Sequence, residues 1–185
     1  MIVGNSEDDR IAIVTLVDED RLGAVIGSKG RVEKYIENKL NVDIKIDTQK
    51  GKVLIITERN NIENGLRAKM IVEAIAHGIS FDHAKKLIDN PDYVLEVLDI
   101  SEYARNKSDM IRIKARLIGQ GGKIKTLIED ELSVKISIRD KYVAILGKHT
   151  DVNIAKDVIQ MICRGSKYGR ALKRINDYRL LQDIY

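Results

Sequence analysis

The chain has 185 residues, 44% of them hydrophobic and 32% charged, with a formal net charge of +4. This is the composition of an ordinary soluble protein, and no apolar run approaches the roughly 18 residues that a membrane span needs. The single cysteine excludes an internal disulfide, and neither it nor the three histidines show metal-ligand spacing. Because the first residues also lack the pattern of a signal peptide, we expect a cytoplasmic protein without a metal or cofactor.

The first part of the chain predicts a series of strands and helices. Residues 10–17 are β-branched and alternate, which is typical of a strand, and residues 32–40 have helical spacing. Gly51 marks a turn between two further strands. In chain order we predict a strand over 10–17, a short helix over 22–26, a helix over 32–40, strands over 42–47 and 53–57, and a long helix over 62–77.

The second part predicts the same order of elements after an apolar connection. Residues 79–107 are too apolar for a flexible linker and predict one or two short helices, broken at Asn90-Pro91. A basic helical tail is predicted over 166–185, because six basic residues stand against two acidic ones from Arg164 onward. Between connection and tail we predict a strand over 110–115, a short helix to 118, a helix over 123–132, strands over 134–139 and 142–146, and a helix over 151–164.

One short pattern occurs twice in the chain. A hydrophobic residue, Gly-x-x-Gly, a basic residue and another hydrophobic residue occupy 26–32 and again 118–124. With a constant offset of 92, nine of 21 aligned positions between 26–46 and 118–138 are identical. A repeat of this length indicates two copies of one supersecondary unit.

Each glycine loop suits the backbone of a single-stranded nucleic acid. Glycine lets a phosphate approach closely because it has no Cβ, and the helix that follows presents unpaired N–H groups and the positive end of its dipole. Neighbouring basic side chains add local positive charge. The predicted RNA-binding residues are Gly27, Ser28, Lys29, Gly30 and Arg31 in the first copy, and Arg116, Gly119, Gln120, Gly121, Gly122, Lys123 and Lys125 in the second.

Base recognition is expected in an apolar groove beside each loop. The candidate groove residues are Ile26, Val32 and Ile46 in the first copy, and Ile118, Ile124 and Ile138 in the second. A single Phe and the absence of Trp argue against a module that stacks bases on an aromatic platform. Only the first loop carries a basic residue, Lys29, between its outer glycines, so the two loops need not bind RNA equally.

The element order is that of the type I KH domain, in which the longest helix comes last. We therefore predict an α+β fold with two such domains, each built as βααββα, with a three-stranded sheet and three helices on one face. The predicted organisation is a first domain over 8–78, a helical linker over 79–107, a second domain over 108–165 and a basic extension over 166–185.

The chain resembles the archaeal KH-domain proteins of ribosomal RNA processing, counterparts of the eukaryotic partner-of-Nob pre-ribosomal factor. The most specific stretch is 115–125, followed by Ile128-Glu129 and the strand end 144–147. The resemblance implies a non-catalytic protein that binds the 3′ end of small-subunit ribosomal RNA. It also implies contact with the endonuclease that trims this end, or with the α subunit of archaeal initiation factor 2. Eukaryotic relatives lack a proper Gly-x-x-Gly in their first unit, whereas Gly27–Gly30 is intact here, and the resemblance ranks the second unit higher.

Three other interpretations remain open from the sequence. An RNA-decay accessory protein of the exosome type would be expected to carry a further β-barrel, for which no run of short strands is left. A nucleotide-binding enzyme is disfavoured because neither loop has the phosphate-binding spacings of such enzymes. A protein-interaction scaffold with inactive KH folds stays possible, because residues 1–163 carry equal numbers of basic and acidic residues.

Overall fold

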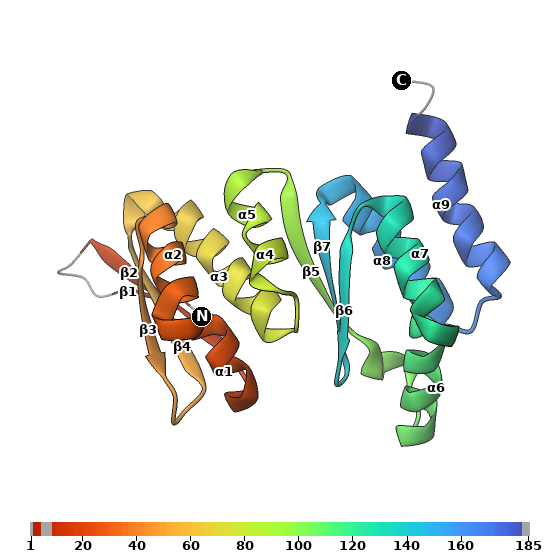
Figure 1. The fold of residues 1–185 in the computed structure, drawn as a ribbon, viewed down its shortest axis with the longest axis horizontal. Helices are drawn as coiled ribbons and strands as arrows, with labels where there is room; N and C mark the ends of the chain where they lie inside the picture. The colour runs from red at the N-terminus through yellow and green to blue at the C-terminus, as the bar shows by residue number, and fades with distance from the viewer. Residues whose placement is uncertain (1, 5–8, 183–185) are drawn as a thin grey trace. The chain divides into compact units, whose positions relative to one another are not determined.

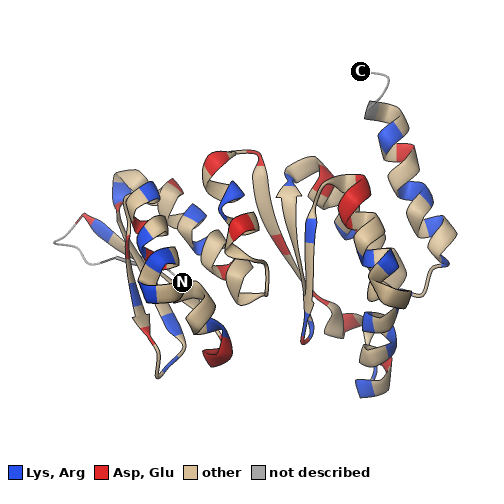
Figure 2. Cartoon of the chain, viewed as in Figure 1, with Lys and Arg blue, Asp and Glu red and all other residues tan. Residues whose placement is uncertain are grey.

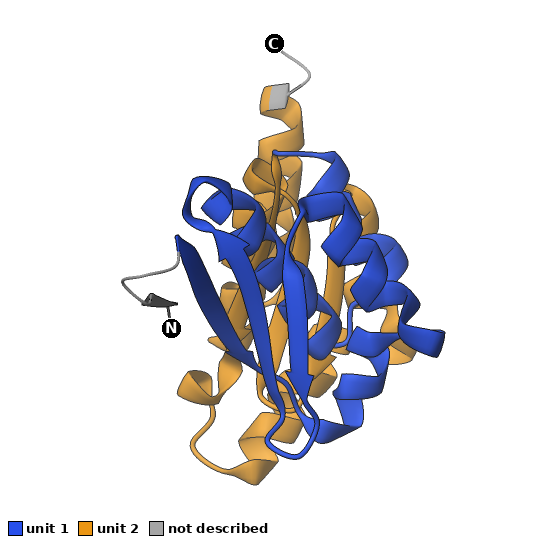
Figure 3. Ribbon diagram, turned by 90° about the vertical axis from the view of Figure 1, so that its left-hand side faces the viewer, with its two compact units in different colours: residues 1–91 blue, residues 92–185 orange. Residues whose placement is uncertain are grey.

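In the computed structural model, which describes residues 2–4 and 9–182, the chain forms two compact units. Unit 1 comprises Met1–Pro91 and unit 2 comprises Asp92–Tyr185 (Figure 3). Each unit contains an antiparallel sheet and helices that pack against it (Figure 1). The predicted α+β class is therefore confirmed.

Unit 1 is built on a four-stranded sheet with the order β1-β2-β4-β3, so the predicted three-stranded sheet is corrected by one added edge strand, β1, which pairs with β2. Alternate residues of its central strands, such as Ile13 and Ile55, are buried, whereas Leu16 is exposed. This alternation places one face of the sheet against helices, with α3 packed on both central strands. The strands are β1 (Ile2–Gly4), β2 (Arg10–Leu16), β3 (Asp43–Asp47) and β4 (Lys52–Glu58), and the helices are α1 (Glu19–Ile26), α2 (Arg31–Leu40), α3 (Ile62–Ala76), α4 (Phe81–Ala84) and α5 (Lys86–Asp89).

Unit 2 is built on a three-stranded sheet with the order β5-β7-β6. Its core is formed by apolar residues from all three strands and four helices, including Ile113, Ile145 and Val158. The strands are β5 (Tyr93–Asp99), β6 (Lys135–Arg139) and β7 (Tyr142–Lys148), and the helices are α6 (Lys107–Ile118), α7 (Lys123–Leu132), α8 (His149–Cys163) and α9 (Tyr168–Gln182).

The first strand of unit 2 is not where the sequence places it. The segment predicted as a strand, 110–115, lies inside α6, and the strand is β5, within the segment predicted as a helical connection. All seven residues of β5 pair with β7, whereas Ile113 and Leu117 are buried on one side of α6 at helical spacing. The prediction of one or two short helices over 79–107, broken at Asn90-Pro91, thus holds before the break, where α4 and α5 lie, and is wrong after it, where β5 lies.

Within the described residues the tail predicted over 166–185 forms a helix, α9, which contributes to the core of unit 2, and residues 183–185 of that prediction lie outside the described residues. Ala171 and Ile175 on α9 are fully buried and form part of its hydrophobic cluster. Within the described residues, no helix combines the length and apolar character needed to cross a membrane. The same part of the chain contains no cluster of three or more His, Cys, Asp or Glu side chains placed to hold a metal ion.

Candidate nucleic-acid interface

The two glycine loops, Gly27–Gly30 and Gly119–Gly122, have the same backbone conformation. Gly27 has φ 72° and ψ 171°, and Gly119 has φ 73° and ψ 173°, values that side-chain-bearing residues rarely adopt. A Cβ on Gly27 would lie 2.5 Å from Cγ2 of Val32, and one on Gly119 would lie 2.5 Å from Cγ1 of Ile124. The first glycine of each loop is therefore required both by backbone angle and by the hydrophobic residue packed beneath it.

The third position of each loop has equivalent geometry but different chemistry. Lys29 has φ 54° and ψ 32°, and Gly121 has φ 59° and ψ 24°, so both residues are left-handed. A Cβ on Gly121 would have no neighbour within 4 Å, and the Lys29 side chain is exposed. The side chain at this position therefore faces open space and sets the charge of the loop.

Each loop leads directly into a helix whose first turn is available to an anion. Gly30 precedes α2 and Gly122 precedes α7, both in the left-handed region, and no described side chain caps either helix start. The N–H groups of Arg31 and Lys123 donate to the loop carbonyl oxygens of Ser28 and Gln120. The N–H groups that follow them in the first turn and the positive end of the helix dipole favour a phosphate at this position. Arg31 and Lys123 are exposed as the first residues of the two helices.

The charges near the two loops also differ in the first turn of the helix that follows each loop. Glu33 on α2 corresponds to Lys125 on α7 in the repeat. Partial burial and the neighbouring Glu37 carboxylate raise the pKa of Glu33 above its ordinary value. Lys125 makes an ion pair with Glu129, with 3.0 Å between Nζ and Oε2. The second loop thus has a cation where the first has an acid.

A pair of equivalent carboxylates joins the helix after each loop to the next strand. Oε1 of Glu37 accepts a hydrogen bond from the backbone N–H of Ile44, and Oε1 of Glu129 accepts one from Ile136, both at 2.8 Å. Because these strands form the sides of the predicted grooves, the carboxylates fix the groove geometry. The sequence signal for this role was present, since Glu is identical at the two positions of the repeat.

The predicted groove residues provide apolar surface that is partly accessible. Ile118 is 40% exposed. The other five candidates, Ile26, Val32, Ile46, Ile124 and Ile138, are partly buried. The polar loop residues Ser28 and Gln120 are exposed. In each unit the loop and its flanking helices come from one continuous segment, so they are adjacent in the fold.

Arg116, which was predicted to bind RNA, has contacts within the protein. Its guanidinium donates a hydrogen bond to the carbonyl oxygen of Ser166 and lies 5.5 Å from the centre of the Tyr168 ring. The Tyr168 hydroxyl in turn donates to the carbonyl oxygen of Arg116 at 3.0 Å. Arg116 therefore joins the end of α6 to the turn between α8 and α9, a connection that sequence reasoning missed because the partners are 50 residues apart.

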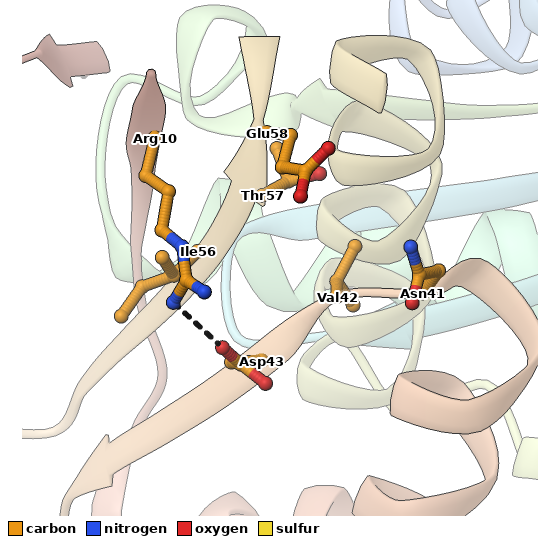
Figure 4. Close-up of a pocket in the computed structure, with 7 residues that line it drawn as sticks. All are labelled: Arg10, Asn41, Val42, Asp43, Ile56, Thr57 and Glu58. Carbon is orange, nitrogen blue, oxygen red and sulfur yellow. Dashed lines mark ion pairs between the residues drawn. The ribbon is translucent and has the colours of Figure 1, made fainter. Parts of the chain in front are cut away.

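Two surface hollows lie away from the glycine loops. The first, of about 140 Å³, is beside the C-terminal end of α2 and contains an Arg10–Asp43 ion pair of 3.5 Å (Figure 4). The second, of about 370 Å³, is at the C-terminal end of α7, with Tyr178 and Arg179 among its lining residues. Neither hollow includes a residue of the predicted RNA-binding set.

Comparison with known proteins identifies the family. Residues 94–179 match the family model for the second KH domain of PNO1, described as a eukaryotic type KH-domain of type I. A KH domain-containing protein of Methanocaldococcus jannaschii is 35% identical over 174 residues, which cover 94% of this chain and 76% of the relative. The RNA-binding protein pno1 of Dictyostelium discoideum is 25% identical over 176 residues, which cover 94% of this chain and 73% of the relative.

Solved structures agree with these relatives. The crystal structure of Dim2p from Pyrococcus horikoshii superposes with a TM-score of 0.82 and 28% identity, covering 90% of this chain and 98% of that one. A second structure from the same organism, the a/eIF2alpha–aDim2p–rRNA complex, gives a TM-score of 0.83 and 28% identity, covering 91% and 94%. The resemblance expected from the sequence is confirmed: the chain belongs to the PNO1 (Dim2p) family of KH-domain proteins.

Proposed function

We propose that the protein binds single-stranded RNA in ribosomal RNA processing, and that its ligand is the 3′ end of small-subunit ribosomal RNA. The main support for the proposal is that the two glycine loops share the same backbone conformation, and that each loop is followed directly by a helix whose start has no side-chain cap. A relative from Schizosaccharomyces pombe is named a pre-rRNA-processing protein, and one similar structure is a complex with rRNA. The role is non-catalytic, and we place it in the cytoplasm.

Two type I KH domains in tandem form the proposed architecture. The order β2-α1-α2-β3-β4-α3 in unit 1 and the order β5-α6-α7-β6-β7-α8 in unit 2 support it. The observed strands shift the proposed start of the second domain from residue 108 to β5. The initial prediction of a helical linker is then reduced to α4 and α5, while α9 forms the basic extension.

The second unit is the stronger proposed RNA-binding site. Lys123 and Lys125 lie in the first turn of α7, whereas the first turn of α2 contains Glu33. A phosphate near the first loop would meet that acid but also the exposed Lys29. The preference for the second unit is therefore supported chiefly by the match of residues 94–179 to the model of a second KH domain. Protein contacts with an rRNA 3′-end endonuclease and with the initiation factor 2 α subunit are further proposals. The second is supported by a similar protein whose complex contains a/eIF2alpha.

The test is a titration of a fluorescent oligonucleotide that matches the 3′ end of small-subunit ribosomal RNA, beside a scrambled control. In the variant Gln120→Asp, Gly121→Asp, two acidic side chains face the phosphate and should abolish tight binding. The matched variant Ser28→Asp, Lys29→Asp introduces the same two acids into the first loop and also removes the Lys29 cation, and it should still have a smaller effect. Circular dichroism checks that both variants fold.

Two results would contradict the proposal. Equal affinity of the wild-type protein for the matching and scrambled oligonucleotides would favour a general RNA-decay accessory role. Undiminished affinity in both loop variants would show that neither glycine loop holds the phosphate, and would leave the scaffold interpretation standing.

A further inference from the structure

The basic residues of α9 fall into two groups that differ in their contacts. Arg174 pairs with Asp157 on α8 at 3.3 Å, and Arg179 pairs with Glu131 on α7. Lys167, Arg170 and Lys173 are exposed, and no carboxylate lies within ion-pair distance of them in the described part of the chain, residues 2–4 and 9–182. Figure 2 shows basic residues distributed along α9 and in the turn before it. One group of charges thus stabilises the helix position, and the other is available to a ligand.

The available group lies beside the segment that leads into the second glycine loop. The turn before α9 is held to α6 by the hydrogen bond from Arg116 to Ser166 and by the one from Tyr168 to Arg116. Arg116 is three residues before Gly119, the first glycine of that loop. Lys167 follows Ser166 directly, so the charged group begins at this junction.

The fold holds these charges in place before any ligand arrives. Ala171 and Ile175 are buried in the core of unit 2, and the Tyr178 hydroxyl donates to Asp151 on α8 at 2.8 Å. Lys167 lies in the turn directly before α9, and Arg170 and Lys173 are three residues apart within the helix, which keeps these two side chains on one side of it. A fixed helix loses little backbone entropy on binding, and its N-terminal end adds positive potential.

We propose that Lys167, Arg170 and Lys173, here called the α9 ridge, bind phosphates of the RNA strand that flank the nucleotides in the second glycine loop. The inference rests on the proposed function, because it extends the same RNA-binding surface. A KH groove holds about four nucleotides, so the ridge would contact only longer strands. Each phosphate contact on a single strand contributes about 0.7 to the slope of log affinity against log salt.

The test compares two RNA lengths with one variant. In the full chain, Lys167→Gln, Arg170→Gln and Lys173→Gln are combined, and binding of oligonucleotides of about six and about 14 nucleotides is measured over a salt series. For the longer strand, the salt slope should fall by about 2 and the affinity at 0.1 M salt by up to about a hundredfold. The shorter strand should bind as it does to the wild type.

The control variant removes charge from the same helix at residues that are already paired. Arg174→Gln combined with Arg179→Gln should leave the salt slope for both strands unchanged, and thermal unfolding identifies any loss of α9 packing. If the ridge variant weakens binding of the short and the long strand equally, or leaves binding of the long strand unchanged, the proposal for the α9 ridge is wrong while the proposed function stands. Failure of the wild-type protein to bind either strand would overturn the proposed function and the ridge together.

Discussion

Replacing Gly121 by lysine should strengthen RNA binding while leaving the fold intact. The residue occupies the backbone conformation that Lys29 adopts in the first loop, with φ 59° against 54°. A Cβ at Gly121 would have no neighbour within 4 Å, so the new side chain meets no steric obstacle. It would place a cation over the loop at the position where the first unit already has one.

The expected magnitudes follow from backbone strain and from counterion release. A residue other than glycine in the left-handed region costs about 1 kcal/mol, which a domain of ordinary stability tolerates. One additional phosphate contact on a single strand steepens the salt slope by about 0.7, which corresponds to about a fivefold gain in affinity at 0.1 M salt. The gain should shrink to about threefold at 0.2 M salt.

Fluorescence anisotropy over a salt series separates the charge from the strain. Gly121→Gln makes the same backbone change without a charge, so it should bind RNA no more tightly than the wild type. The reciprocal change, Lys29→Gly, tests the first loop and should have little effect if the second unit provides the main site. Unchanged or weaker binding by a folded Gly121→Lys variant would refute the placement of a phosphate over this loop.

Three further predictions concern stability and reactivity. Glu129→Ala leaves the buried N–H of Ile136 without its acceptor and should cost about 1–3 kcal/mol in urea unfolding, and an unchanged midpoint would contradict the role of this carboxylate. Hydrogen bonds from Lys141 and Ser101 lower the pKa of Asp99 to about 2, so its contribution to stability is present above about pH 4 and lost as the pH falls towards 2. The stability of the Asp99→Asn variant should therefore depend less on pH in this range. If the variant and the wild type lose stability equally between pH 4 and 2, the role of Asp99 is contradicted. Burial raises the pKa of Cys163 to about 11, so the native protein should resist thiol reagents at pH 8, and rapid labelling would show an accessible thiol.

The glycine loops and their following helices were predictable because local sequence determines them. The first glycine of each loop is required by its own backbone angles, and the hydrophobic residue under it is five positions away. The repeat then placed the next strand in both units, since its offset of 92 holds through Ile138. Short-range constraints of this kind leave few alternatives.

The first strand of unit 2 was not predictable from the repeat, because the repeat fails before the loop. β2 begins at Arg10, so the repeat offset of 92 predicts that the equivalent strand of unit 2 begins at residue 102, whereas β5 begins at Tyr93. Residues 110–115 alternate well enough for a strand, but burial of Ile113 and Leu117 makes the segment helical. The missed signal was Asn106, whose side chain accepts a hydrogen bond from the N–H of Asp109 and begins α6.

The contacts of Arg116 lay beyond sequence reasoning for a different reason. A basic residue beside a glycine loop has the same local pattern whether it binds phosphate or a backbone carbonyl. Only the packing of α9 against α8 brings Ser166 and Tyr168 to its side chain. Whether Arg116 is available to RNA therefore depends on contacts that only the tertiary fold reveals.

The open third position of the glycine loops also bears on how the two halves could diverge after a duplication. The first glycine of each loop is held by its backbone angles and by the hydrophobic residue packed against it, and the side chain at Lys29 or Gly121 faces open space, so changes at the third position do not disturb the core. Selection could then add or remove nucleic-acid affinity in one half by a single codon while the other half kept its original task. In a tandem of this kind, one unit can change its affinity for nucleic acid through loop substitutions that leave the fold of both units intact.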